Sequence, residues 1–258
     1  MSDRAAIDLK TFGLFALFVG LLSAGGAMTA RGIVPLWAGG LIGLAAFNLT
    51  FTIWHESVHN TISTSRAFCT IVGVATSFFM FLPGYFTLRR EHLMHHKYQG
   101  DPERDPVYPR VQCRPWLFPL RLLLVVLWDP QPANPERRLS WGERIVDGLT
   151  LAAFLAAAGG AAAAGYAKEV LAVWIAPRLL IAPIHAFYVC FLPHAAGGPE
   201  FYRTFRIVLR NPFTRYLTMY HSFHGLHHLW PNIPWHRYRR VFNERRAELE
   251  SQGVEILG

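Results

Sequence analysis

Residues 33–60 read IVPLWAGGLIGLAAFNLTFTIWHESVHN, in which an uncharged apolar run at 33–54 leads into two histidines. Because the hydrocarbon core of a bilayer is about 30 Å thick, about 20 consecutive apolar residues are enough for one membrane-crossing helix. Residues 33–54 therefore predict a transmembrane helix. His55 and His59 follow it four residues apart, which places both on one face of a helix, one turn from each other.

Three more stretches are apolar enough to cross a membrane, and they are residues 11–30, 145–166 and 170–192. The stretch 145–166 is rich in alanine and glycine, so we expect neighbouring helices to approach closely along it. The composition agrees, since 52% of the residues are hydrophobic and only 16% are charged, against about 25% in soluble domains. With no linker, repeat or low-complexity segment, we expect one all-α membrane domain over residues 1–258 with four transmembrane helices.

The basic residues predict which side of the membrane each segment faces. The net charge is +8, and lysine and arginine concentrate in residues 89–144 and 203–246. The short loops at 31–32 and 167–169 carry one basic residue each. Because basic residues accumulate on the cytoplasmic side, we expect both termini and both long polar segments in the cytoplasm, in a multi-pass protein of a bacterial inner membrane. Topology explains the charge more simply than nucleic acid does, so we expect no nucleic-acid partner.

One further apolar run, residues 67–88, is long enough to cross the membrane, but a Pro-Gly pair at 83–84 interrupts it. Full crossing would put residues 55–66 and 89–115 on opposite sides, although both carry basic residues. We therefore expect 67–88 to be re-entrant or interfacial.

Two shorter segments predict helices outside the bilayer core. Residues 116–128 are too short to cross and contain Arg121, which is typical of a helix lying in the membrane plane. Residues 239–253, RRVFNERRAELESQG, predict a cytoplasmic amphipathic helix that ends near Gly253.

Three histidine clusters lie just outside the predicted spans: WHESVH at 54–59, HLMHH at 92–96 and HSFHGLHH at 221–228. His194 follows the fourth span in FLPHAAGG. In HxxHH the first and last residues share a helix face and the middle one points about 100° away from its neighbour, so one helix can offer imidazoles to two adjacent metal ions. Neutral imidazole suits iron, zinc and copper. A lone histidine is more often a packing residue, but the repeated pattern at membrane exits favours a non-haem iron site.

Three other histidines keep more than one interpretation. His221 is a candidate ligand, a candidate hydrogen-bond partner of a ligand, or a helix cap. His185 lies within the fourth span, where an ionisable residue is often functional, although a buried hydrogen bond is an equal alternative. We expect His236 to be an interfacial residue. A metal transporter would place its ligands near the middle of the membrane, and the clusters do not lie there.

The histidine pattern resembles that of the membrane fatty-acid-desaturase superfamily, in which HxxxH, HxxHH and HxxHH surround a di-iron centre. The carotenoid ring hydroxylases and ketolases of the desaturase type are the most similar branch. Their likeness extends to HLMHHKYQGDPERDP at 92–106, FLPHAAGG at 191–198 and HGLHHLWPNIPWHRY at 224–238.

The resemblance implies a cytoplasmic cap with two iron ions and O2 as co-substrate. It implies iron ligands at His55, His59, His92, His95, His96, His194, His224, His227 and His228, with no catalytic residue beyond these ligands. The implied reaction is O2-dependent oxidation of C–H bonds in a lipophilic substrate, first of all hydroxylation of β-carotene rings to give xanthophylls. A carotenoid ketolase and a fatty-acyl desaturase share the same centre and stay as alternatives.

The hypothesis predicts hydrogen-bond partners for the ligating histidines and an electron donor for the reaction. Ligating histidines usually donate their second N–H to a carboxylate or a carbonyl, and Glu56, Glu91, Asp101 and Asp105 are the candidates. The chain has no dinucleotide-binding, haem-attachment or CxxC motif, so we expect an external electron donor such as a ferredoxin or a cytochrome with its reductase.

Overall fold

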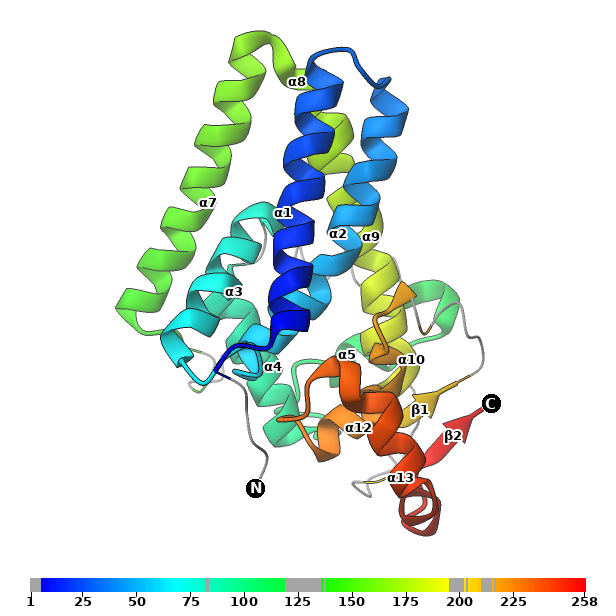
Figure 1. Ribbon diagram of the computed structural model, residues 1–258. Helices are drawn as coiled ribbons and strands as arrows, with labels where there is room; N and C mark the ends of the chain where they lie inside the picture. The colour runs from blue at the N-terminus through cyan, green and yellow to red at the C-terminus, as the bar shows by residue number, and fades with distance from the viewer. Residues whose placement is uncertain are drawn as a thin grey trace. The chain divides into compact units, whose positions relative to one another are not determined.

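The computed structural model describes residues 6–81, 84–118, 136, 138–194, 202, 204–209, 215 and 217–258. Most of these residues are helical (Figure 1). The longer elements are α1 (Leu9–Ala30), α2 (Leu36–Val58), α3 (Arg66–Met80), α4 (Tyr85–Tyr98), α7 (Trp141–Ala161), α9 (Ala176–His185) and α13 (Tyr238–Ser251). The shorter ones are α5 (Tyr108–Val111), α8 (Ala167–Glu169), α10 (Leu192–His194), α12 (His224–Leu229), β1 (Arg206–Val208) and β2 (Glu255–Leu257).

The chain divides into two compact units. The first contains Met1–Thr87 and Ser140–Ala182, and the second contains Leu88–Leu139 and Pro183–Gly258. Helices α4 and α9 each contribute residues to both units. A single domain over the whole chain stays a prediction.

In the first unit, aromatic and glycine contacts hold the apolar helices together. Phe18 of α1 is fully buried and meets Phe47 of α2 and Phe79 of α3 edge to face. Gly43 of α2 lies against the π-helical stretch Val170–Ile175, where a Cβ would come within 2.2 Å of the Val173 carbonyl oxygen. This contact brings two helix backbones together without an intervening side chain.

The close approach that we expected along 145–166 lies elsewhere. A Cβ at Gly148, Gly159 or Gly160 would meet no atom of the described residues within 4 Å. Among the described residues, close glycine contacts involve α2 and α3 instead, at Gly43 and Gly73. Most small residues of α7 face outward, and the buried residues of that helix are Phe154 and Ala158.

Three helical runs are long and apolar enough to cross a membrane: Leu9–Ala30, Leu36–Val58 and the 54-residue run Trp141–His194. The third run is not one straight helix. Gly165 has φ 95° and ψ 2°, values outside the helical region, and Figure 1 shows the chain turning back between α7 and α8. Glycine adopts positive φ at little cost, so the turn falls at this residue, close to the loop predicted at 167–169.

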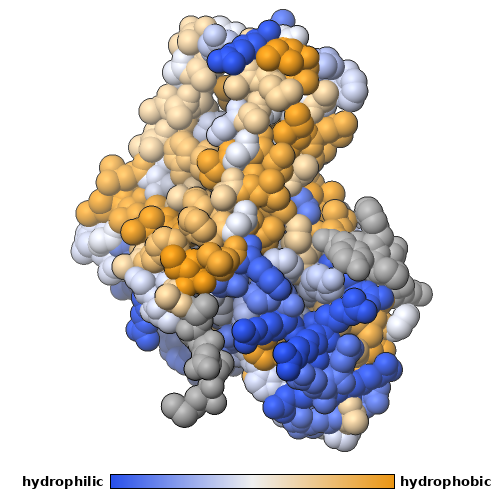
Figure 2. Space-filling model, viewed as in Figure 1, coloured by the Kyte–Doolittle hydropathy of each residue, from blue (hydrophilic) through white to orange (hydrophobic). Residues whose placement is uncertain are grey.

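The surface of these helices is apolar. Leu17, Leu41, Leu149 and Leu155 are each more than half exposed, and Figure 2 shows hydrophobic surface over α1, α2 and α7. A large exposed apolar surface indicates contact with lipid or with protein, and together with the apolar runs it fits a multi-pass membrane protein.

The run 67–88 covers most of α3 and the start of α4, which are separate helices. They would make a fourth candidate span only if both were counted as one broken span, and the alternative is a re-entrant loop. Most of the in-plane helix expected over 116–128 lies outside the described residues. The described part of this segment contains the short 3-10 turn Pro115–Leu117.

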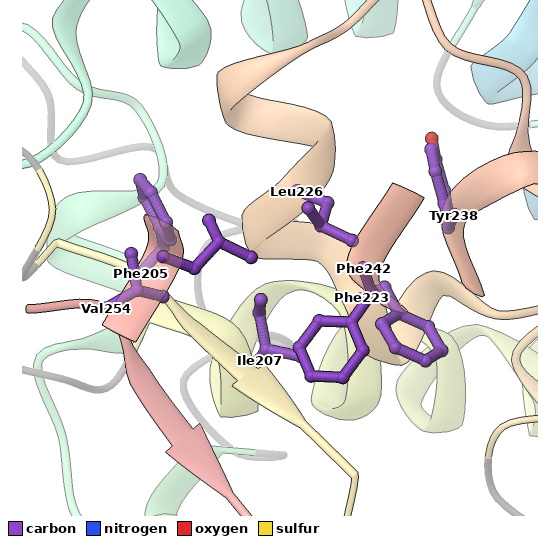
Figure 3. Close-up of a cluster of buried hydrophobic side chains, with 8 residues drawn as sticks. Phe205, Ile207, Phe223, Leu226, Tyr238, Phe242 and Val254 are labelled. Atoms are coloured by element: carbon purple, nitrogen blue, oxygen red, sulfur yellow. The ribbon is translucent and has the colours of Figure 1, made fainter. Parts of the chain in front are cut away.

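The second unit contains its own apolar core. Strands β1 and β2 pair in parallel, with Arg206 opposite Glu255 and Val208 opposite Leu257. The core joins these strands to α12 and α13 (Figure 3) and consists of Phe205, Ile207, Phe223, Leu226, Tyr238, Phe242, Leu249 and Val254. Helix α13 ends at Ser251, and Gly253 follows with φ 81°, so the predicted amphipathic helix over 239–253 is confirmed.

Candidate metal centre

The first histidine pair lies where α2 ends. His55 is in the last turn and is fully buried, and His59 is the C-terminal cap, with its N–H donating to the His55 carbonyl. Their ring centroids are 4.9 Å apart. Glu56 Oε1 lies 3.6 Å from His55 Nδ1, and Glu56 Oε2 accepts a hydrogen bond from the Thr61 hydroxyl. The expected one-face arrangement of this pair is therefore present.

The second cluster occupies the last two turns of α4. His92 and His96 are four residues apart, and their Nε2 atoms are 3.1 Å apart. His95 points elsewhere, because its Nδ1 lies 2.8 Å from the buried Asp105 Oδ1. Helical geometry thus separates the first and last histidines of HxxHH from the middle one, as its spacing predicts.

His194 ends the long helical run at α10. Its Nε2 lies 3.2 Å from His95 Nε2 and 3.2 Å from His228 Nε2. Its Nδ1 lies 3.4 Å from the Thr204 carbonyl oxygen. The side chains of His95, His194, His224 and His228 are all buried, and each can offer one nitrogen within 4.8 Å of the others.

The third cluster, on α12, contributes to both groups. His224 and His228 belong to the group around His194, whereas His227 Nε2 lies 2.8 Å from His96 Nε2. The rings of His96 and His228 stack with centroids 4.4 Å apart, so the two groups are neighbours. The second unit alone therefore contains two adjacent sets of histidine nitrogens, one from four rings and the other from His92, His96 and His227.

The core of the second unit holds α12 in this position. Leu226 lies between the histidines of the box and points toward Ile207 and Phe223 (Figure 3). A Cβ at Gly225 would lie 2.7 Å from Phe205 Cδ2 and 3.2 Å from the Arg206 carbonyl oxygen. This glycine lets α12 pack directly on β1, so its apolar side meets the core. Two of its histidines contact the edge of that core, because His228 stacks on Phe205 and His227 meets the Tyr238 hydroxyl.

Hydrogen-bond chemistry tests whether the four-histidine group fits a metal ion. A carboxylate and a carbonyl oxygen can only accept, so Asp105 and Thr204 bind hydrogens on the Nδ1 atoms of His95 and His194, which leaves Nε2 of each ring as the atom that can bind a metal. As metal ligands, both rings would present lone pairs at Nε2 atoms that are only 3.2 Å apart. Two lone pairs at this distance repel each other unless a cation binds both, so the residues fit a shared metal ion.

The distances and protonation states agree with that interpretation. Two nitrogens bound at about 2.1 Å and separated by angles of roughly 90–110° lie about 3.0–3.4 Å apart. Three pairs of Nε2 atoms lie at 3.1 or 3.2 Å, within this range, and the fourth pair, His96 and His227, is closer at 2.8 Å. Burial, followed by the neighbouring histidines, lowers the pKa of His224 and of His228 well below the usual value. Both imidazoles are therefore neutral at physiological pH, the state in which imidazole binds metals.

The four acidic candidates have different roles. Asp105 contacts a histidine directly, and its oxygens also accept the N–H groups of Gly100 and Val107. Asp101 accepts the N–H groups of Glu103 and Arg104, which is a turn-forming role. Glu91 pairs with Arg110 at 3.0 Å, and Glu56 lies near His55 as described above.

The other three histidines lie outside the two groups described in the second unit. His221 is fully buried and meets the Tyr238 ring edge to face. His185 is buried at the end of α9, and His236 packs against Trp235. Sequence reasoning missed two partners of the cluster. The Thr204 carbonyl faces His194, and the buried Tyr238 hydroxyl lies 3.2 Å from His227 Nδ1.

Apolar helical runs and buried histidine groups suited to a transition metal define a metal-binding membrane protein. Comparison with known proteins gives the family. The model of the fatty acid desaturase family matches residues 31–257, so the chain belongs to this family, and all the predicted ligands lie within the match. The resemblance to membrane desaturases is thereby confirmed.

One curated relative adds detail. The chain is similar to a zeaxanthin 4-ketolase of Chlamydomonas reinhardtii, with 26% identity over 197 residues, which cover 72% of this chain and 39% of the relative. The chain thus spans about two fifths of the length of that relative. Family and relative together place the chain in the membrane desaturase superfamily, near the carotenoid ketolases and hydroxylases.

Proposed function

We propose that this protein is an O2-dependent membrane oxygenase with two iron ions, whose ligands are the nine histidines at 55, 59, 92, 95, 96, 194, 224, 227 and 228. The observation that carries the proposal is the division of the HxxHH boxes on α4 and α12 between two adjacent groups of nitrogens. When bound, the irons would supply the reduction of O2 and the removal of hydrogen from an unactivated C–H bond, chemistry that side chains lack.

The residues of the chain have defined tasks in this proposal. Asp105 and the Thr204 carbonyl hold the hydrogens of two rings on Nδ1 and so keep each Nε2 available. Burial of His95, His194, His224 and His228 keeps that group away from water, which strengthens electrostatic interactions and limits side reactions.

We assign the substrate class from the membrane setting and the family. A lipophilic substrate suits an enzyme of the bilayer, and the carotenoid-type motif at 224–238 favours ring hydroxylation. Each hydroxylation consumes one O2, two electrons and two protons, and it forms one C–OH and one water. The two electrons come from a separate donor, a ferredoxin or a cytochrome with its reductase.

A ring ketolase is the second candidate, and the name of the Chlamydomonas relative favours it. A second hydroxylation at the same carbon gives a geminal diol, which loses water to form a ketone. The two candidates need the same residues and differ in how often one carbon is oxidised.

Expression in cells that accumulate β-carotene tests these assignments. We expect new hydroxylated pigments on chromatography, and their absence when His95→Ala is expressed at the same level. Ring ketones would favour the second candidate. Unchanged pigments together with new double bonds in the acyl chains would replace both candidates with a lipid desaturase.

We also propose four membrane crossings, with the third helical run crossing twice on either side of Gly165, and with the termini and the histidines on the cytoplasmic side. Cysteine labelling tests this topology after Cys69, Cys113 and Cys190 are replaced by serine. In intact cells an impermeant thiol reagent should label Arg31→Cys and Lys168→Cys but not Gln252→Cys. Labelling of Gln252→Cys alone would reverse the orientation.

A further inference from the structure

Helices α3 and α4 each have an end here whose backbone groups need partners from outside their own helix. The last carbonyls of α3 and the first N–H groups of α4 have no partner within their own helices, and such groups cost several kcal/mol each in lipid. Side chains from the long third run satisfy the end of α3. Trp174 Nε1 donates to the Phe79 carbonyl at 2.7 Å, and Arg178 Nε donates to the Met80 carbonyl at 3.2 Å.

Asp147 of α7 satisfies the start of α4. Its Oδ1 accepts the Phe86 N–H at 3.0 Å, and its Oδ2 accepts the Thr87 N–H at 2.9 Å and the Thr87 hydroxyl at 2.8 Å. A helix N-cap side chain normally accepts from these second and third N–H groups. The residue at the cap position of α4 is Gly84, which has no side chain, so the cap comes from another helix.

Gly84 and Asp147 fit each other. A Cβ at Gly84 would lie 2.3 Å from Asp147 Cγ and 2.6 Å from its Oδ1. The carboxylate therefore occupies the place that a local cap side chain would fill. A carboxylate in an apolar run is often a functional group, but here both oxygens are already bound to the first turn of α4.

Tyr85 fixes the same turn from a second direction. Its ring lies over Gly73 of α3, where a Cβ would come within 2.1 Å of Tyr85 Cε2. Its hydroxyl donates to the Ser57 carbonyl at 3.4 Å, and Ser57 lies between the two histidines of the HxxxH pair. The first turn of α4 is thus attached to α7, to α3 and to the end of α2.

We propose that Asp147 is a positioning residue, which caps α4 from another helix and so fixes the first turn of the helix that carries the HxxHH box at 92–96. Helix α4 is continuous from Tyr85 to Tyr98, so a shift of its first turn moves every histidine on it. The cap itself is independent of any metal, and only its effect on metal binding rests on the proposed function.

Two readouts test the inference on the full chain in detergent. In the metal-free protein, Asp147→Ala should speed hydrogen exchange at the Phe86 and Thr87 amides about tenfold, the size of effect that a lost N-cap gives. In the same variant, the affinity for Fe²⁺ should fall about tenfold or more, as it does when groups that support metal ligands are removed. Asp147→Asn keeps one acceptor oxygen, so its exchange rate and its Fe²⁺ affinity should lie between those of Asp147→Ala and the wild type. It can be measured if the alanine variant does not fold.

Second-site rescue separates positioning from a general loss of stability. Gly84→Ser alone should weaken Fe²⁺ binding, because its Cβ collides with the carboxylate. Combined with Asp147→Ala, the serine hydroxyl can cap α4 locally in the vacated space, so both readouts should recover. The matched control is Asp8→Ala, which removes the cap that accepts the Thr11 N–H of α1, and it should leave Fe²⁺ binding unchanged.

Each negative result contradicts a different part of the inference. Unchanged hydrogen exchange at the Phe86 and Thr87 amides in Asp147→Ala would show that Asp147 does not cap α4. Faster exchange with normal Fe²⁺ affinity in Asp147→Ala would contradict the positioning role. So would a Gly84→Ser, Asp147→Ala double variant whose exchange rates and Fe²⁺ affinity equal those of Asp147→Ala. A wild-type protein without Fe²⁺ affinity would refute the proposed function, while the exchange data would still decide the cap.

Discussion

At the residue scale, the candidate centre depends on which ring nitrogen of each histidine carries the hydrogen. Asp105 and the Thr204 carbonyl determine this for His95 and His194, and the Tyr238 hydroxyl contacts the third box at His227. Such partners orient a ring and raise its basicity. Their removal should therefore weaken metal binding although the ligands themselves remain.

Asp105→Asn is expected to weaken iron binding about 10–100-fold, because the amide lacks the negative charge and cannot accept at both of its ends. Metal titration of the purified variant measures the change. Asp101→Asn is the matched control, since Asp101 lies on the same loop and accepts the backbone N–H groups of Glu103 and Arg104. Equal affinities for the two variants would exclude the role of Asp105.

His95→Ala should lose turnover and at least about one iron per chain, because its Nε2 faces His194 within the four-histidine group. Elemental analysis of the purified variant gives the iron content. His236→Ala, outside that group, should keep its iron. A His95→Ala protein with full iron and full turnover would remove His95 from the site.

The sequence predicted which histidines gather in the second unit better than it predicted their hydrogen-bond partners. The spacing of HxxHH is enough to predict the directions of its side chains, because the helical period separates the middle histidine from the other two. Asp105 was one of four acidic candidates, and only the fold distinguishes it from Asp101. A carbonyl such as that of Thr204 has no signature in a sequence, since every residue carries one.

At the scale of elements, α12 combines core packing and candidate metal binding in one short helix. Leu226 packs into the core, Gly225 lets the helix lie directly on β1, and His224, His227 and His228 belong to the histidine groups. The position of three predicted ligands therefore depends on the packing of one short helix.

Gly225→Ala should lower stability by about 1–3 kcal/mol, the usual effect of overpacking, because the new Cβ meets Phe205 and the Arg206 backbone. It should also weaken iron binding by shifting His224 and His228. Thermal unfolding and metal titration measure both effects. Gly148→Ala, on the open face of α7, should change neither, and a similar loss in both variants would contradict this account of α12.

The long helices were predictable and the short strands were not. The spans expected at 11–30 and 33–54 correspond to α1 and α2 within a few residues, because about 20 apolar residues are a strong signal. Strands β1 and β2 have three residues each and pair across about fifty positions of sequence. Neither their length nor their pattern gives a periodic signal.

At the scale of the whole molecule, the proposed metal ions link distant parts of the sequence. The four-histidine group alone joins residues 95, 194, 224 and 228. A ligand that binds only the folded state stabilises it, by about 2.7 kcal/mol at a concentration of 100 times Kd. Metal removal should therefore lower the unfolding temperature as well as the activity.

Chelation followed by readdition of Fe²⁺ tests this coupling. We expect the unfolding temperature of the purified protein to fall on chelation and to recover with Fe²⁺, and His95→Ala should respond less than the wild type. An unfolding temperature that chelation does not change would show that metal does not hold these segments together.

The most direct test of the central claim is the iron content of purified protein with demonstrated activity, measured per polypeptide by elemental analysis. The proposal predicts two irons per chain and loss of activity in step with their removal. Full activity in protein without bound metal would contradict it.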